Sequence, residues 1–195
     1  MRREETRRRL FHSGRNAFAR DGFAATSVET IAAEAGYTRG GFYSNFTGKS
    51  QFLLELLQLD FCAARDGLTI VFDVQQAAEN PIFACSRSQD DQQLILWIEA
   101  KLLAARDPHF CDQFNAVLHE RLTRFTDRFR QYIISVDTYS PLAPDTLAIG
   151  FMGIFYGMNL ARLANPEGMT SRKIEDVLRS FTDLVLPKTI LSRDR

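Results

Sequence analysis

Residues 18–57 read FARDGFAATSVETIAAEAGYTRGGFYSNFTGKSQFLLELL, and this stretch decides the fold of the amino-terminal part of the chain. Apolar residues recur in it at helical spacing, and glycines interrupt them. We expect Asp21-Gly22 to end a first helix that begins near residue 4, and Gly36 to stop a short second helix that begins at Thr26. Thr38 then caps a third helix that runs through Phe46. Three short helices with a tight turn before the third are what a helix-turn-helix requires.

The same stretch provides a small core beneath these helices. Thr26 to Glu29 fits the capping box, in which a Thr hydroxyl and a Glu carboxylate satisfy backbone N–H groups at a helix start. The residues expected to fill the core recur at helical spacing, and they are Ile31, Ala32, Ala35, Phe42 and Phe46. Residues 47–50 open a fourth, longer helix.

The third helix leaves a mixture of small and hydrogen-bonding residues facing outward. Arg39 could donate a bidentate pair of hydrogen bonds to guanine, and Asn45 could pair with an adenine edge. Gly40 and Gly41 are poor helix formers, which makes sense where a helix must approach DNA closely. Thr26 and Lys49 lie at helix starts, where a phosphate also meets exposed N–H groups. The predicted DNA-binding residues are therefore Thr26, Thr38, Arg39, Gly41, Tyr43, Ser44, Asn45 and Lys49.

Residues 7–57 resemble the amino-terminal domain of the TetR family of bacterial regulators. The resemblance is carried by Phe-Ala-Arg-Asp-Gly-Phe, Thr-Ser-Val-Glu-Thr-Ile-Ala, Ala-Gly, Gly-Phe-Tyr-Ser-Asn-Phe and a lysine four residues before Leu53. It implies that Tyr43 and Lys49 contact phosphates, and that four residues face the groove: Arg39, Gly41, Ser44 and Asn45. Gly41 stands where the family commonly has Thr or Ser, and Asn45 where it often has His.

The zero net charge of the chain hides an asymmetry. Residues 1–50 contain nine Lys/Arg against five Asp/Glu, whereas the remainder contains 15 against 19. A basic module joined to an acidic body is typical of a protein that meets a polyanion with one part. The arginines among residues 2–9 could reach phosphates or the minor groove. They could equally form a solvated segment with pairs such as Glu4–Arg8 and Glu5–Arg9.

Beyond residue 57 the chain reads almost entirely as helix, with its best loop at residues 79–91. Expected helices cover residues 94–105, a very long one from Asp107-Pro108, then 145–164 and 170–186. The most hydrophobic stretch, Thr146 to Met158, is too short for a bilayer span of about 20 residues, and we expect a buried helix there. Scattered cysteines and the lack of a secretion signal suggest reduced thiols in the cytoplasm.

Two carboxy-terminal helices are expected to form a dimer. Residues 147–163 are apolar nearly all round, so a helix there must be covered on every side, and the same helix of a second chain could do so. Three glycines on one stripe would let backbones approach, and two helices from each chain would make a four-helix bundle. The alternative is a core within one chain. The predicted interface comprises Gly150, Gly153, Gly157, Ile174, Val177, Leu178 and Phe181.

The resemblance also implies that the helical body binds a small effector. The sequence has 16 phenylalanines, many of them in the body, and aromatic side chains could line an apolar pocket between helices. An aromatic stripe at helical spacing is, however, more often plain core. The predicted pocket residues are Phe61, Arg65, Trp97, Phe114, His119, Phe151 and Phe155.

An enzymatic function is not expected. Cys111, Asn115 and His119 share one helix face, but neighbours lie about 6 Å apart along the axis and do not easily form the hydrogen bond that a nucleophile and its base need. The sequence has no nucleotide fingerprint and no metal-ligand spacing, so we expect no cofactor and no metal. Two other classes remain, a helical scaffold without DNA function and a DNA binder that is blind to sequence.

The sequence thus predicts an all-α protein with a helix-turn-helix domain at residues 1–50 and a helical effector-binding and dimerisation domain at residues 51–195. Its expected partners are double-stranded DNA with a palindromic operator, a second copy of the chain and a small hydrophobic effector, but no membrane. Repression is the usual mode of the family that it resembles. We expect the effector to shift the helix that begins at Thr47.

Overall fold

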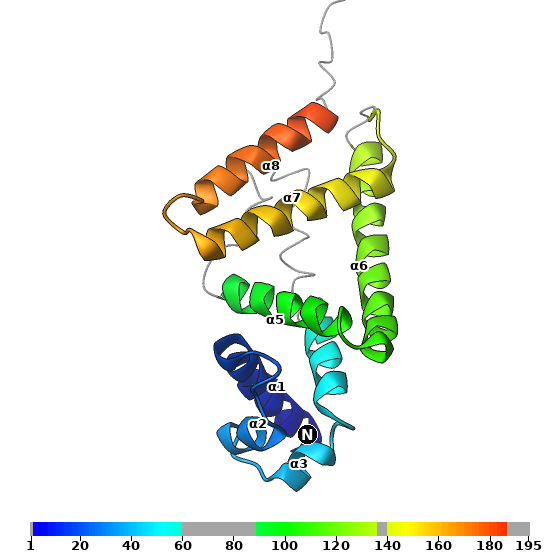
Figure 1. Ribbon diagram of the computed structural model, residues 1–195. Helices are drawn as coiled ribbons and strands as arrows, with labels where there is room; N and C mark the ends of the chain where they lie inside the picture. Colours follow the sequence, from blue (N-terminus) through cyan, green and yellow to red (C-terminus); the bar gives the residue numbers. More distant parts are fainter. Residues whose placement is uncertain (1, 60–88, 136–139, 187–195) are drawn as a thin grey trace, which may run out of the picture. The chain divides into compact units, whose positions relative to one another are not determined.

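The structure, a computed structural model, describes residues 2–59, 89–135 and 140–186. Its helices are α1 (Arg2–Asp21), α2 (Val28–Glu34), α3 (Arg39–Tyr43), a helix at residues 49–59, α5 (Gln89–Ala104), α6 (Pro108–Ser135), α7 (Pro144–Ala164) and α8 (Ser171–Val185) (Figure 1). No strand occurs in these three ranges, and the expected all-α fold is confirmed. The chain divides into two compact units. Of the described residues, 2–59 and 89–117 form unit 1, and 118–135 and 140–186 form unit 2.

Local sequence explains where the helices of unit 1 begin and end. Gly22 and Gly36 adopt φ values of 82° and 79°, the left-handed region that glycine enters without steric cost, and they follow α1 and α2. The helix cap of α2 is Ser27, whose hydroxyl accepts the Thr30 N–H at 3.0 Å, so the prediction of Thr26 as the cap was wrong by one residue. Thr38 caps α3 as predicted, although α3 ends at Tyr43 rather than Phe46.

Unit 1 is built around a cluster of phenylalanine rings with Phe52 at its centre. The centroid of the Phe52 ring lies 4.7, 5.1, 5.2 and 6.0 Å from those of Phe46, Phe11, Phe42 and Phe18. Phe52 comes from the helix at residues 49–59, and its partners come from α1, from α3 and from the turn that follows α3. Because such ring pairs contribute about 0.5–1.5 kcal/mol each beyond area burial, this cluster fixes α3 against the rest of unit 1.

Helix α5 also belongs to unit 1 and packs on α1. Leu96, Trp97 and Ala100 of α5 are buried. Glu99 accepts a hydrogen bond from the Phe23 backbone N–H at 3.0 Å, so α5 contacts the turn between α1 and α2 directly. The start of α6 follows the predicted Asp-Pro pattern, because the Asp107 carboxylate accepts the Phe110 N–H at 3.1 Å.

Unit 2 consists of the second part of α6 together with the antiparallel pair α7 and α8 (Figure 1). Its core combines side chains from all three helices, namely Phe125, Phe129, Leu147, Ala148, Phe151, Ile174, Leu178, Val185 and Leu186. Helix α8 is capped by Thr170, whose hydroxyl accepts the Lys173 N–H at 3.3 Å. Among the described residues α7 has the length and composition of a membrane-crossing helix, a property that core helices share.

Two sequence predictions fall partly or wholly outside the described residues. The loop expected at residues 79–91 is described only from Gln89 onward, and Gln89 to Asp91 form the first turn of α5 rather than loop. Two predicted pocket residues, Phe61 and Arg65, also lie outside the described ranges.

Candidate nucleic-acid interface

The outer face of α2 and α3 presents the polar residues that a DNA-reading helix needs. Phe42 is the fully buried residue of α3, while the residues exposed on α3 and at its two ends are Thr38, Arg39, Tyr43 and Ser44. The Thr38 hydroxyl accepts the Gly41 N–H at 3.2 Å, which fixes the first turn of α3. The core residue at the base and the cap at the start together hold the exposed face in one orientation.

Arg39 contacts both a carboxylate and an aromatic ring on this face. Its Nη1 lies 2.9 Å from Glu29 Oε1, an ion pair that joins the first turn of α2 to the first residue of α3. The guanidinium carbon lies 5.5 Å from the centroid of the Tyr43 ring, within cation–π distance. Both charged side chains remain more than half exposed. Sequence reasoning selected Arg39 but not Glu29, because the two residues meet only when α2 and α3 pack.

Asn45 and Gly41 are less open than their sequence positions indicate, whereas Gly40 is open. The Asn45 amide nitrogen donates to Gly41 O at 2.9 Å, so the side chain is bonded to its own helix and is half-buried. A Cβ atom at Gly41 would lie 3.3 Å from Tyr37 Cβ, whereas one at Gly40 would meet nothing nearer than Thr38 Oγ1 at 3.7 Å. Gly40 is therefore the position at which α3 is open to a close approach.

Thr26 and Lys49 have partners within unit 1. The Thr26 side chain is 2 % exposed, and its hydroxyl donates toward Gly22 O at 2.7 Å and Ala17 O at 3.2 Å. Lys49 Nζ donates to Phe23 O at 2.6 Å and to Thr26 O at 2.8 Å, and burial lowers the pKa of its ammonium group. Both residues close the turn between α1 and α2, so a phosphate would have to compete with carbonyl oxygens for the Lys49 protons.

Arg7 of α1 holds the chain that follows α3, a role that sequence reasoning missed. Its Nη1 donates to the backbone oxygen of Asn45 at 3.1 Å, and its Nη2 forms an ion pair with Glu55. The guanidinium carbon also lies 4.5 Å from the centroid of the Phe46 ring. The partners are 38 and 48 residues away in sequence, so no local pattern could reveal them.

The arginine-rich amino terminus forms part of α1 rather than a tail before it. Glu5 pairs with Arg9 at 2.7 Å, as predicted, and also with Arg8 at 2.8 Å. The hydrogen bonds from Arg8 and Arg9 lower the pKa of Glu5 to about 2. All three side chains are exposed, so the pairs lie on the surface.

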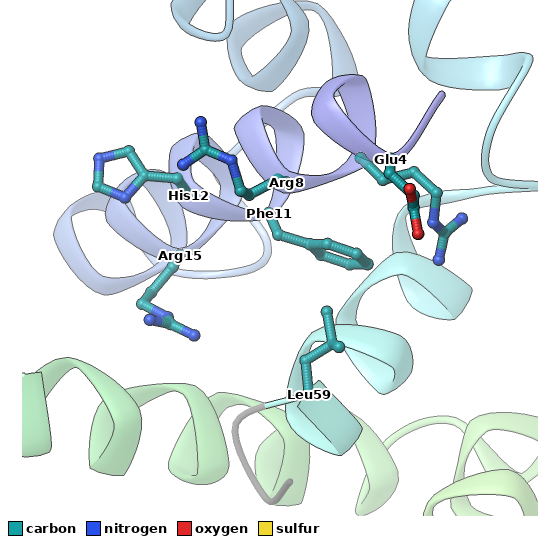
Figure 2. A pocket seen from close by; sticks show the side chains of 7 residues that line it. Glu4, Arg8, Phe11, His12, Arg15 and Leu59 are labelled. Atoms are coloured by element: carbon teal, nitrogen blue, oxygen red, sulfur yellow. The ribbon is translucent and has the colours of Figure 1, made fainter. Parts of the chain in front are cut away.

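A cavity of about 450 Å³ lies on one face of α1 (Figure 2). In this view Phe11 and Leu59 point toward each other across it. Burial lowers the pKa of the Arg15 guanidinium at its edge. The full lining is Glu4, Arg7, Arg8, Phe11, His12, Arg15 and Leu59. It includes none of the residues predicted to line an effector pocket.

The predicted pocket residues that the structure describes are mostly core. Trp97 and Phe114 are each 2 % exposed in unit 1, with ring centroids 5.8 Å apart. In unit 2 Phe151 is buried against Phe129, and Phe155 is half-buried. His119 is exposed on α6. Trp97, Phe114 and Phe151 are thus packed inside the chain, and their role in an effector pocket stays a prediction.

The predicted dimer residues divide into buried and open groups. Ile174 and Leu178 are 5 % and 1 % exposed in the core of unit 2. Gly150 faces α8, where a Cβ would lie 3.4 Å from Phe181 Cζ, and Phe181 is half-buried. Three positions remain open on the surface, namely Gly153, Gly157 and Val177, and a Cβ at either glycine would meet no atom within 4 Å.

The residues considered for catalysis lie on the surface of α6. The Asn115 amide nitrogen lies 3.5 Å from Cys111 Sγ, one turn away, and His119 is exposed a further turn along. Within the described part of the chain, no group of three or more His, Cys, Asp or Glu residues is placed to hold a metal ion.

An exposed polar helix seated on a capped helix and a phenylalanine core defines a helix-turn-helix DNA-binding domain. Comparison with known proteins then supplies the family: residues 10–56 match the family model for bacterial regulatory proteins of the tetR family. Residues 10–56 therefore form a DNA-binding domain of the tetR type.

Relatives by sequence agree with this assignment. The HTH-type transcriptional regulator SrpR of Pseudomonas putida is 28 % identical over 137 residues, which cover 68 % of this chain and 60 % of SrpR. The HTH-type regulator YerO of Bacillus subtilis is 40 % identical over 50 residues, 26 % of this chain and 17 % of YerO. The alignment thus spans less than two thirds of either relative.

Solved structures extend the likeness of fold to nearly the whole chain. A structure from Rhodococcus sp. described as a TetR-family regulator has a TM-score of 0.77 at 15 % identity and covers 94 % of this chain and 99 % of its own. A transcriptional regulator from Saccharomonospora viridis, in complex with choline, has a TM-score of 0.75 at 18 % identity. The match covers 94 % of this chain and 98 % of that structure's chain. At these identities the likeness establishes the fold.

Proposed function

We propose that the chain is a cytoplasmic, sequence-specific repressor that binds a palindromic operator as a homodimer and is released by a small hydrophobic effector. In this proposal residues 1–50 read DNA, and residues 51–195 bind the effector and dimerise. The observation that carries it is the exposed polar face of α3, with Arg39 and Tyr43 pointing outward above buried Phe42. Such a face can place hydrogen-bond donors against base edges in the major groove.

The proposal is tested by a gel shift with DNA from upstream of the chain's own gene. The protein should retain this duplex when random duplex is added in large excess, because base contacts add to the phosphate contacts that any duplex offers. Equal competition by random duplex would indicate a DNA binder that is blind to sequence, and no shift at all would indicate a scaffold protein.

Dimerisation is supported by the apolar residues that α7 and α8 leave exposed. Ile149 and Leu160 of α7 are 58 % and 52 % exposed, and Val177 and Leu184 of α8 are 44 % and 78 % exposed. Large apolar side chains that gather on a surface mark interaction sites in soluble proteins. A second copy of the same two helices would cover them as a four-helix bundle, which would also supply two readers for two half-sites.

Light scattering after size exclusion tests the dimer. Leu184→Glu should convert it to a monomer, because a carboxylate would be buried without a partner at the interface. Gln113→Glu, which adds the same charge at an exposed position of α6, should leave the dimer intact. A Leu184→Glu protein that remains dimeric would place the interface elsewhere.

Effector release is supported by family resemblance and by the choline held by one structural neighbour. We propose that the effector shifts the helix that begins at Thr47 and thereby changes the separation of the two readers. A thermal-shift screen of small hydrophobic compounds would find ligands, because a compound that binds the native state raises the melting temperature. Each hit should then weaken operator binding, and equal binding by free and saturated protein would refute the mechanism.

A further inference from the structure

We propose that Glu29 of α2 is a specificity-determining residue of the DNA-reading face, the exposed side of α2 and α3 that includes Arg39, Tyr43 and Ser44. Its carboxylate holds the Arg39 guanidinium in an orientation suited to a guanine edge and opposes the use of that guanidinium on phosphate. The inference rests on the proposed sequence-specific function. It starts from the 2.9 Å ion pair between Glu29 Oε1 and Arg39 Nη1 and from the Tyr43 ring, whose centroid lies 5.5 Å from the guanidinium carbon.

Stability does not explain this pair. The Glu29 and Arg39 side chains are 54 % and 65 % exposed, and ion pairs in such surroundings contribute little to folding. Helices α2 and α3 are packed against each other, Ile31 and Phe42 are fully buried without this pair, and each helix has its own hydroxyl cap. A carboxylate on this face also repels the phosphates of every duplex and lowers affinity for DNA in general, so an advantage for binding must come from discrimination between duplexes.

The geometry of the guanidinium group explains how discrimination arises. Arg39 carries five N–H donors in a planar fork, and the contact through Nη1 leaves other donors free to bind guanine O6 and N7 together. Because Glu29 already holds the guanidinium of Arg39, the remaining donors can bind those two acceptors without further loss of side-chain freedom. A phosphate can also bind the guanidinium through two donors, but it must compete with the Glu29 carboxylate for the same positive charge and is repelled by it.

Removal of the Glu29 charge should therefore strengthen binding to random DNA and not to the operator. The operator is obtained by selection from a random duplex library with the full-length protein. Dissociation constants for operator and random duplex are then measured over a range of salt concentrations for wild type, Glu29→Gln and Arg39→Ala, and for the double variant. We expect Glu29→Gln to reduce the ratio of the two affinities at least about fivefold, the lower end of what one bidentate guanine contact contributes.

The salt dependence supplies an independent readout. A guanidinium freed to bind phosphate should steepen the slope of log K against log salt on random duplex by about 0.9. In the Arg39→Ala background Glu29→Gln should leave the affinity ratio unchanged, since the carboxylate acts through Arg39. Glu34→Gln is the matched control, because Glu34 lies on the same helix and pairs with Arg20 at 2.8 Å, and it should preserve the ratio.

Each outcome decides the matter. An unchanged ratio in Glu29→Gln, or an equal change in the Arg39→Ala background or in Glu34→Gln, overturns the role of Glu29 while selection of an operator upholds the proposed function. If selection enriches no sequence and wild type binds all duplexes alike, sequence-specific regulation fails, and the role of Glu29 fails with it.

Discussion

Gly14→Ala is expected to destabilise unit 1, although alanine is a better helix former than glycine. Gly14 lies in the middle of α1, directly against the Phe52 ring. A Cβ atom at position 14 would overlap Cε1 and Cζ of that ring. The ring cannot move aside, because Phe52 is fully buried among the rings of Phe11, Phe18, Phe42 and Phe46.

The magnitude follows from two opposing contributions. Replacing glycine by alanine inside a helix stabilises by up to about 1 kcal/mol. An extra methyl group forced into a packed core costs about 1–3 kcal/mol, and a ring held on all sides points to the upper part of this range. We therefore expect Gly14→Ala to lower the free energy of unfolding by about 1–2 kcal/mol net, or the melting temperature by roughly 2–8 °C.

Thermal and urea denaturation of four proteins at one fixed concentration test this reasoning: wild type, Gly14→Ala, Phe52→Leu and the double variant. Leucine has no Cε1 or Cζ atom, so in the Leu background the alanine should be neutral or stabilising by up to about 1 kcal/mol. Gly40→Ala is a control in a helix without a close neighbour and should not destabilise. If Gly14→Ala cost the same with Leu at position 52, the ring contact would not be the cause.

Three further predictions concern the contacts of Lys49, Thr38 and Glu5. Lys49→Met should lower the free energy of unfolding by about 1–3 kcal/mol in urea titrations, because two carbonyl oxygens of the α1–α2 turn lose their donor. A variant with wild-type stability and weaker DNA binding would instead indicate that Lys49 contacts a phosphate. Thr38→Ala should lower the free energy of unfolding by about 1 kcal/mol and weaken operator binding, since α3 loses its cap. Thr38→Ser should retain the stability and the operator affinity of wild type. Equal losses in the two variants would contradict a capping role. In a carboxyl NMR titration Glu5 should titrate near a pKa of about 2, below its ordinary 4.5. Its stabilisation of α1 is therefore complete above pH 4.5 and is lost as the pH falls toward 2. Arg8→Gln should raise the pKa of Glu5, and an unchanged pKa would rule out the Glu5–Arg8 pair as a cause.

Periodic patterns predicted the helices well, because each depends on residues close in sequence. Leu10, Phe11, Ala17 and Phe18 recur at helical spacing in α1 and are all buried, and the glycine that ends α1 has a positive φ. The cap of α2 was misplaced by one residue because Thr26 and Ser27 both have hydroxyl groups. The Thr26 hydroxyl is instead directed back to carbonyl oxygens of α1 and of the turn, a tertiary contact that no local rule describes.

The residues that position the DNA-reading face were harder to predict than those exposed on it. Arg39, Tyr43 and Ser44 follow from one helical wheel, since exposure on α3 is a local property once Phe42 is assigned to the core. Arg7 and Glu99 act across 38 and 76 residues, and a lone Arg or Glu on a helix reads as an ordinary solvated residue. Long-range contacts of this kind depend on which helices pack, which a single sequence does not reveal.

The supports of the DNA-reading face come from several elements of unit 1, and this bears on how variants should be interpreted. Arg7 donates to the Asn45 carbonyl beyond α3. In the turn before α2, Lys49 donates to the backbone carbonyl of Phe23 and Glu99 accepts from its backbone N–H. Loss of a support should weaken binding to all duplexes together with stability, and it should leave the ratio of operator to random affinity nearly unchanged. A residue that reads bases, the role proposed for Arg39, should change that ratio at constant stability. Measuring both quantities for each variant therefore separates residues that read DNA from residues that hold the reading face in place.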